Sequence, residues 1–190
     1  MAAHAIESAL CQTKPFDNIY FVDDGVGDCK HLHYDINYVF RENNFGVVDN
    51  FNDMLDRVES DYIMFLGADN WLRPDTLELL CKNDTDIITY DIMVTGELRE
   101  EIAIPYKDDC TWKDGDVYWK REMKHHGSML YNVKLAKQVG GYADNKTSSR
   151  TDEDLNLWDK MVAEGATISY VPQALLYYRR HKSNFYKYGI

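Results

Sequence analysis

Cysteine is scarce in this chain, and its spacing argues against a disulfide framework. The sequence has 4 Cys, at Cys11, Cys29, Cys81 and Cys110, and no two of them form a C-x-x-C pair. Disulfide-stapled domains are short secreted chains with many cysteines. We therefore expect reduced thiols and a cytoplasmic location.

Long apolar runs and an excess of positive charge are also missing. No apolar stretch approaches the roughly 20 residues that cross a bilayer, and no secretory signal pattern opens the chain. Lys and Arg number 21 against 32 Asp and Glu, which gives a formal net charge of -11. Because nucleic-acid binding needs a basic face, we expect no nucleic-acid partner and no membrane span. A polyanionic ligand would require a metal ion or a few focused basic side chains.

The chain does contain short apolar runs that end in acidic residues. They are FVDDG at 21–25 and FLGADN at 65–70, and a third acidic cluster, TDED, lies at 151–154. A buried strand that ends in an acid presents its carboxylate at the sheet edge where open α/β sheets bind ligands. Several carboxylates at that edge suit a cation and the phosphates that it carries.

Apolar periodicity predicts one α/β domain with a largely parallel sheet, because strand and helix patterns alternate and 190 residues suffice for one core. Residues 47–58 carry the apolar stripe of an amphipathic helix, and residues 62–66 form a continuous apolar run typical of a buried strand. Leu155, Trp158 and Val162 indicate a later helix. Residues 96–120 are predicted to be irregular. Further strands are predicted at 18–22, 34–40, 86–94, 167–171 and 174–178, and further helices at 3–11, 74–80 and 132–139.

Six segments, in this order, resemble the motifs of family 2 glycosyltransferases, which have the GT-A fold. They are FVDDGVGD (21–28), ENNFGVVDNFN (42–52), YIMFLGADNWLRPD (62–75), GSMLYNVKLAKQVGGYAD (127–144), DEDLNLWDKMVAEG (152–165) and YYRRHKSN (177–184). The resemblance implies a single GT-A domain over 1–190, with a nucleotide-binding half at about 1–72 and an acceptor-binding and catalytic half at about 73–190. The resemblance starts at the family's first helix, so we expect the family's first strand to be absent from the sheet.

The resemblance implies a nucleotide site built from several polar residues. Asp23 matches an acid that accepts a hydrogen bond from the imide N–H of the donor's base. The alternative is a turn aspartate, since Asp-Gly favours turns. Asn44 and Asn52 are implied to contact the nucleotide, with solvent exposure as the alternative. Ala68, inside the family's D-x-D motif, is also implied to lie beside the nucleotide.

The same resemblance implies a divalent metal site. Asp69 matches the second acid of D-x-D, which binds Mn²⁺ or Mg²⁺ on the donor's phosphates, while Gly67 stands in place of the first acid. His181 is implied as a metal ligand and Arg179 as a phosphate contact. The alternatives are a loop aspartate for Asp69 and a solvated basic strand end for His181. Asn70 is a candidate to compensate for the missing acid.

Asp154 matches the family's catalytic base, which takes the proton from the acceptor hydroxyl. The alternative is structural, because Thr151 and Asp154 have capping-box spacing. Glu153 and Gly141 are implied to lie near the donor sugar. The Gly140-Gly141 pair is first of all a helix stop.

The resemblance therefore implies an inverting, metal-dependent glycosyltransferase. It would move a sugar from a nucleotide-diphosphate sugar to a glycan, a lipid-linked acceptor or a protein-linked acceptor. The alternative is a catalytically inactive nucleotide- or carbohydrate-binding remnant of the fold. A phosphohydrolase would need D-x-D-G-T, and a nucleotidyltransferase would need an early glycine-rich loop with Lys or Arg. Neither pattern occurs.

Overall fold

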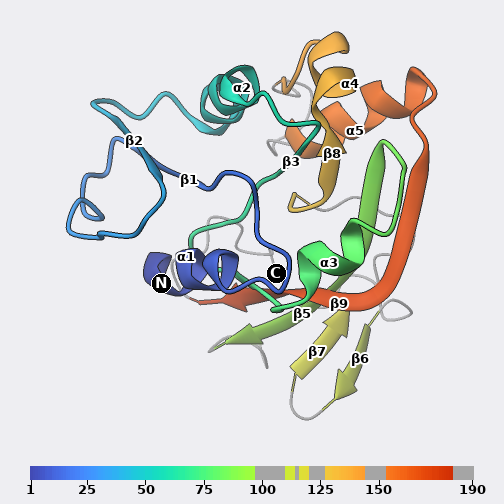
Figure 1. Cartoon of the computed structure of the whole chain (residues 1–190), viewed down its shortest axis with the longest axis horizontal. Helices are drawn as coiled ribbons and strands as arrows, with labels where there is room; N and C mark the ends of the chain where they lie inside the picture. Colours follow the sequence, from blue (N-terminus) through green and yellow to red (C-terminus); the bar gives the residue numbers. More distant parts are fainter. Residues whose placement is uncertain (97–109, 114–115, 120–126, 144–152, 182–190) are drawn as a thin grey trace, which may run out of the picture.

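The computed structural model of the chain describes residues 1–96, 110–113, 116–119, 127–143 and 153–181, in which helices and strands alternate (Figure 1). The helices are α1 (Ala2–Leu10), α2 (Val47–Arg57), α3 (Thr76–Leu80), α4 (Val133–Gln138) and α5 (Glu153–Ala163). The strands are β1 (Tyr20–Asp24), β2 (Asn37–Arg41), β3 (Tyr62–Met64), β4 (Trp71–Leu72), β5 (Ile87–Gly96), β6 (Cys110–Lys113), β7 (Asp116–Trp119), β8 (Leu130–Asn132) and β9 (Ile168–Arg180).

The described strands form two separate sheets. β1 and β2 pair in parallel as a two-stranded sheet, with Tyr20 opposite Asn37. The larger sheet has seven strands in the order β3-β8-β5-β7-β6, with β9 beside β5 and β4 beside β9. Figure 1 shows β1 and β2 set apart from β5 and β9. The expected absence of the family's first strand stays a prediction.

The sheet was predicted to be largely parallel, but most of the described strand pairs are antiparallel. β1 with β2 and β5 with β9 are parallel, whereas the other pairs of the larger sheet are antiparallel. Residues 96–120, predicted to be irregular, contain β6 and β7, which pair antiparallel. Antiparallel strands need only a tight turn between them, and the Asp-Gly dipeptide at 114–115 is a hairpin signal that the periodicity argument missed.

The two segments predicted as separate strands around Pro172 are one strand, β9. Val171 pairs with Tyr90 and Ala174 pairs with Asp91, so Pro172 and Gln173 bulge out of the ladder. Proline has no N–H to donate, and a bulge is one of the few places where a sheet accommodates it. The bulge therefore lets the strand continue past the proline.

Helices form where periodicity predicts them, although two details differ. α5 buries Leu157 and Met161, and Trp158 of the predicted stripe packs against the core, whereas the other two stripe residues, Leu155 and Val162, are exposed. Both stripes have helical spacing, and only packing distinguishes them. α3 begins at Thr76 rather than at the proline of residue 74.

The core consists of two apolar clusters on opposite sides of β5. One cluster includes Ile88 and Leu175, and the other includes Ile87 together with Tyr131 and Leu157. Consecutive strand residues point to opposite faces, so Ile87 and Ile88 join the two clusters through one strand. β5 is thus buried on both faces and anchors the larger sheet.

Three cysteines, Cys11, Cys29 and Cys81, are free, and the side chain of Cys110 lies outside the described residues. Within the described ranges, the structure contains no helix of the length and apolar character needed to cross a bilayer. The division into halves at about residue 72 stays a prediction.

Candidate functional site

Two residues implied as metal ligands meet at the end of the larger sheet. Asp69 lies in the loop after β3, and His181 directly follows β9. Asp69 Oδ2 is 3.1 Å from His181 Nε2. Their side chains are 30% and 14% exposed, respectively, so both remain accessible to a small ligand. The fold thus brings together two groups that are more than 100 residues apart in sequence.

Arg179 fixes the loop that carries Asp69. Its Nε donates a hydrogen bond to the Asp69 carbonyl oxygen (3.0 Å), and its backbone N donates to Asn70 Oδ1 (2.9 Å). The guanidinium also stacks 4.6 Å from the centre of the Trp71 ring and lies 3.1 Å from His4 Nδ1. These contacts tie the loop after β3 to the end of β9.

Gly67 has a steric role in the same loop. A Cβ atom at this position would lie 2.8 Å from Asn70 Nδ2 and 2.9 Å from Asp69 Oδ1. These two side chains therefore occupy the space that an acid at position 67 would need. Asn70 is buried, and its amide oxygen is used to hold Arg179.

Asp69 and His181 fit a divalent cation as a pair. Carboxylate oxygen and imidazole nitrogen are ligands that Mn²⁺ accepts, and metals in nucleotide sites often have few protein ligands beside phosphate oxygens. Among the residues that the structure describes, no group of three or more His, Cys, Asp or Glu could hold a metal. A cation held by this pair would take its remaining ligands from the oxygens of a bound ligand or of water.

Asp154 lies in the first turn of α5, largely shielded from solvent. Burial, and then the nearby charge of Glu153, raise the pKa of Asp154 from 3.8 to about 7. Its Oδ1 has no hydrogen-bond partner among the described residues. Its Oδ2 lies 2.5 Å from where a Cβ of Gly127 would be, so a larger residue would collide with the carboxyl. Thr151, the partner in the capping alternative, lies outside the described residues.

Two tyrosines that the sequence interpretation missed lie near Asp154. Tyr131 and Tyr142 are buried, and their hydroxyl oxygens lack hydrogen-bond partners among the described residues. Burial is the main cause that raises the pKa of both phenols, and the charge of Asp154 adds to it. Both phenols thus stay neutral at physiological pH. Tyr142 directly follows Gly141, which the sequence resemblance places near the donor sugar, and this adjacency was the signal that could have identified Tyr142.

Asp23 is committed to a turn. Its Oδ1 accepts hydrogen bonds from the backbone N of Val26 (2.8 Å) and of Gly27 (2.9 Å), and its Oδ2 accepts a second one from Gly27 (2.9 Å). The next residue, Asp24, forms an ion pair of 3.0 Å with Arg41. The turn interaction is thus present, while the contact of Asp23 with a base stays a prediction, because a carboxylate has further acceptor sites.

Asn52 is half-buried and hydrogen-bonded to Tyr142, the residue after the buried Gly141. Asn52 Oδ1 accepts from Tyr142 N (2.8 Å), and Asn52 Nδ2 donates to Tyr142 O (2.9 Å). Gly141 has φ of 64° and its N donates to Ala136 O (2.9 Å), so the predicted helix stop is confirmed. Asn44 is exposed, and its Oδ1 accepts from the backbone N of residue 46 (2.9 Å). Ligand contacts of Asn44, Asn52 and Gly141 stay predictions.

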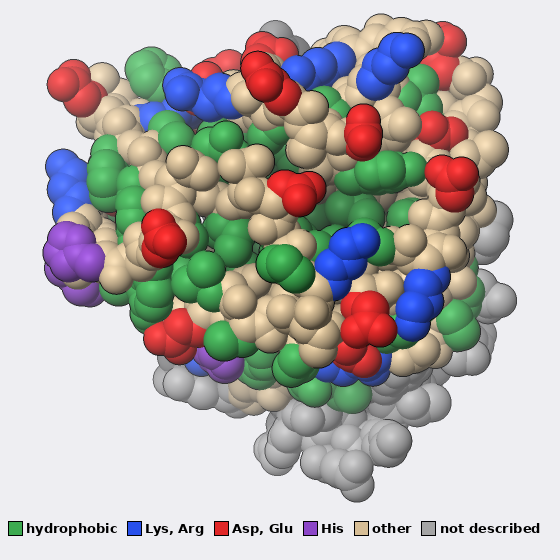
Figure 2. Space-filling model, in the orientation of Figure 1, with side chains coloured by type: hydrophobic (Ala, Val, Ile, Leu, Met, Phe, Trp, Pro, Cys, Tyr) green, Lys and Arg blue, Asp and Glu red, His purple; other side chains and the backbone are tan. Residues whose placement is uncertain are grey.

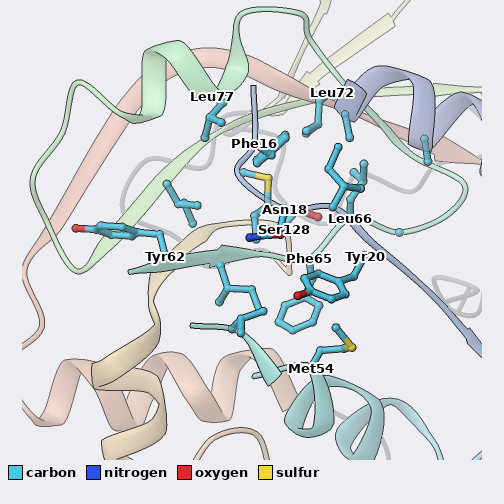
Figure 3. Close-up of a pocket in the computed structure, with 18 of the residues that line it drawn as sticks. Phe16, Asn18, Tyr20, Met54, Tyr62, Phe65, Leu66, Leu72, Leu77 and Ser128 are labelled. Carbon is cyan, nitrogen blue, oxygen red and sulfur yellow. The ribbon is translucent and has the colours of Figure 1, made fainter. Parts of the chain in front are cut away.

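A cavity of about 750 Å³ lies beside these groups (Figure 3). Gly67, Ala68, Glu153 and Asp154 line one part of it, whereas Asp69 and His181 lie outside its lining. Most of its other lining residues are apolar and come from α1, α2, β1 and β3. Figure 2 shows hydrophobic side chains among polar ones across the middle of the face that Figure 1 presents. The cavity thus connects the Asp154 carboxyl to the loop that carries Asp69.

Comparison with known proteins gives one family match. The model of the family described as "Glycosyl transferase family 2" matches residues 1–140. No curated protein matches the sequence of this chain.

Solved structures of TarS from S. aureus are among those that share the fold of this chain. TarS 1–349 has a TM-score of 0.69 at 16% identity, over 94% of this chain and 56% of that chain. TarS 1–349 in complex with UDP-GlcNAc has a TM-score of 0.70 at 17% identity, and the match covers 96% of this chain and 56% of that chain. This chain therefore spans about half the length of these solved chains. The likeness confirms the predicted GT-A fold.

Proposed function

Since this chain belongs to glycosyl transferase family 2, whose model matches residues 1–140, we propose that it transfers a sugar from a nucleoside-diphosphate sugar to an acceptor hydroxyl. TarS, which shares the fold, has been solved in complex with UDP-GlcNAc. That complex supports UDP-GlcNAc as the first donor to test. The acceptor we propose is a glycan, free or linked to lipid or protein, and we propose a cytoplasmic location.

The contact between Asp69 and His181 is the observation that carries this proposal. The two side chains would hold Mn²⁺ or Mg²⁺ against the donor's diphosphate, and the bound ion would neutralise negative charge on the departing nucleoside diphosphate. Arg179 holds the loop of Asp69 in place and keeps a permanent positive charge close to it. An acidic protein needs such focused positive charge to bind a diphosphate.

Asp154 would act as the general base. A carboxyl whose pKa is raised to about 7 is a stronger base than an ordinary aspartate and is still partly ionised at neutral pH. It would take the proton from the acceptor hydroxyl as that oxygen attacks the anomeric carbon. One in-line displacement inverts the anomeric centre, so we propose an inverting reaction.

Calorimetry followed by a turnover assay tests the proposal. We expect UDP to bind in the presence of Mn²⁺ and to bind much more weakly in the presence of EDTA. Incubation with UDP-GlcNAc and Mn²⁺ should then release UDP, by transfer or by slow hydrolysis. Failure to bind UDP, UDP-GlcNAc or other nucleotide sugars under these conditions would contradict the proposal.

A binding protein without transferase activity is the second candidate. Gly67 supplies no carboxylate, and both side-chain groups of Asn52 are used inside the protein. These features would weaken donor positioning. UDP binding with Mn²⁺ but without turnover of any nucleotide sugar would favour this candidate over the transferase.

A further inference from the structure

Helix α1 contacts the candidate site through His4, which lies in its first turn. His4 Nδ1 is 3.1 Å from Nη2 of Arg179, and Figure 1 shows α1 beside the end of β9 that carries this arginine. The His4 ring also stacks on the Trp71 ring, with 4.6 Å between the ring centroids and an interplanar angle of 22°. His4 therefore contacts both the arginine implied as a phosphate contact and the aromatic ring over which that arginine lies.

Tertiary hydrogen bonds hold α1 in this place. One turn after His4, Ser8 Oγ accepts a hydrogen bond from Leu72 N of β4 (3.1 Å). Just beyond the helix, Gln12 Nε2 donates to Arg73 O (2.8 Å). Residues four apart lie on the same side of a helix, so the bond of Ser8 to β4 turns His4 toward β4 as well. The position of His4 is thus set by the docking of the whole helix.

The contact with Arg179 defines which form of the His4 ring the structure uses. A guanidinium has only donors and keeps its positive charge. Nδ1 of His4 is therefore the acceptor, which requires a neutral ring with its proton on Nε2. A doubly protonated ring would instead place a second positive charge beside the guanidinium. The acceptor at Nδ1 is the chemical feature that this position supplies.

Arg179 uses two donors of one rigid plane at the same time. Its Nε donates to Asp69 O (3.0 Å) and its Nη2 to His4 Nδ1 (3.1 Å). Because the guanidinium is planar, fixing one donor restricts the direction of the other. Trp71 supports the face of the same plane, with Cζ 4.6 Å from the ring centre. The orientation of the guanidinium, and with it the loop of Asp69, therefore depends on His4.

We propose that His4 is a positioning residue of the candidate site, whose neutral ring orients Arg179 and, through it, the loop of Asp69. It acts through the arginine rather than on the donor itself. The functional consequence rests on the proposed function, in which Asp69 and the positive charge of Arg179 bind the donor's diphosphate and its cation. Loss of the acceptor at His4 should weaken UDP–Mn²⁺ binding about fivefold, the effect of one hydrogen bond at a partly exposed site.

Two substitutions separate the hydrogen bond from the ring stacking. His4→Phe keeps a ring against Trp71 and loses the Nδ1 acceptor, whereas His4→Asn keeps an amide oxygen near the place of Nδ1 and loses the ring. In calorimetry, we expect UDP–Mn²⁺ affinity to fall about fivefold in His4→Phe and to stay within about twofold of the parent in His4→Asn. His31→Phe, the same substitution at an exposed position between β1 and β2, is the matched control and should bind as the parent does. Parent-like affinity in His4→Phe with a loss in His4→Asn would show that stacking alone matters and would overturn the proposal.

Hydrogen exchange without any nucleotide tests the positioning step by itself. The amide of Asn70 donates to Gly67 O (2.9 Å) inside the loop that Arg179 holds. We expect this amide to exchange at least about threefold faster in His4→Phe than in the parent or in His4→Asn, because the loop opens more often. The amide of Leu135 in α4 should exchange at the parent rate. Equal acceleration of both amides would mean global destabilisation, and an unchanged rate at Asn70 would mean that His4 does not hold the loop; either result overturns the proposal.

The two readouts distinguish failure of this inference from failure of the proposed function. If the parent binds no nucleotide, the transferase proposal is wrong, and exchange in the loop still decides whether His4 positions Arg179. If the loop opens in His4→Phe while UDP–Mn²⁺ affinity stays at the parent value, the site does not need His4 and the inference is wrong.

Discussion

Asp69 and Asp154 are both carboxylates of the candidate site, yet their surroundings give them different chemical properties. Asp69 contacts His181 through its side chain and Arg179 through its backbone. Asp154 is shielded from solvent beside Glu153, and its pKa is raised to about 7. Asp69 is thus placed to hold a cation, whereas Asp154 is placed to exchange a proton.

Replacing Asp69 with alanine should abolish the dependence of UDP binding on Mn²⁺. The variant loses the carboxylate that faces His181 and keeps the backbone oxygen that holds Arg179, so the loop should stay folded. We expect UDP–Mn²⁺ affinity to fall by at least about tenfold in calorimetry. Asp61→Ala, an exposed carboxylate near the same strand, is the matched control. Equal affinity of Asp69→Ala and the parent would show that the metal assignment is wrong.

Replacing Asp154 with asparagine should reduce sugar transfer by roughly 10²-fold or more, because asparagine cannot accept the acceptor's proton. Donor affinity should stay close to that of the parent, since the Asp69–His181 pair is untouched. Steady-state rates with UDP-GlcNAc measure the first effect, and calorimetry measures the second. Asp159→Asn, on the exposed side of α5, is the control. A rate within a few-fold of the parent would rule out Asp154 as the base.

The raised pKa of Asp154 also predicts how stability depends on pH. The folded state holds this proton up to about pH 7, whereas the unfolded state releases it near pH 3.8. Raising the pH through this window therefore stabilises the unfolded state and lowers the free energy of unfolding.

Asp154→Asn should remove that loss, so it should be more stable than the parent at pH 8, by about 1–3 kcal/mol, and equal to it below pH 4. Urea unfolding at the two pH values measures the difference. A capping role for Asp154 predicts the opposite sign at pH 8, because loss of a cap destabilises a helix.

Among the secondary structure elements, α4 offers the clearest local test. Asn132 Oδ1 accepts a hydrogen bond from Leu135 N at 3.0 Å, so the Asn132 side chain caps the start of this helix. Asn132→Ala should lower the free energy of unfolding by about 1 kcal/mol in urea titration. Lys134→Ala, an exposed position in the same helix, should change it by only a few tenths. A negligible effect of Asn132→Ala would mean that water replaces the cap.

At the scale of the whole molecule, binding of UDP and Mn²⁺ should raise the free energy of unfolding. UDP and Mn²⁺ together at about 100 times the dissociation constant should raise the free energy of unfolding by about 2.7 kcal/mol, because they bind only the folded state. Thermal unfolding should show a clear rise for the mixture, little rise for either component alone, and reversal by EDTA. The Asp69→Ala variant should show no rise with the mixture. A full rise with UDP alone would argue against a metal in the site.

Local sequence patterns were sufficient to place the helices and the ordered motifs. The cap at Asn132, the stop at Gly141 and the stripe of α2 depend on residues within a few positions of each other. The family was likewise predictable, because its motifs are short and occur in a fixed order. The Asp23 turn was also foreseeable as an alternative, since its bonds reach only to residues 26 and 27.

Tertiary structure decided strand direction, burial and the partners of the site residues. Asp69 reaches His181 and Asn52 reaches Tyr142 across long stretches of chain, and β3 pairs with β8 in the antiparallel sense. The raised pKa of Asp154 comes from burial, which a sequence window does not contain. Periodicity and capping are set by neighbouring residues, whereas pairing and desolvation are set by segments that become neighbours only when the chain folds.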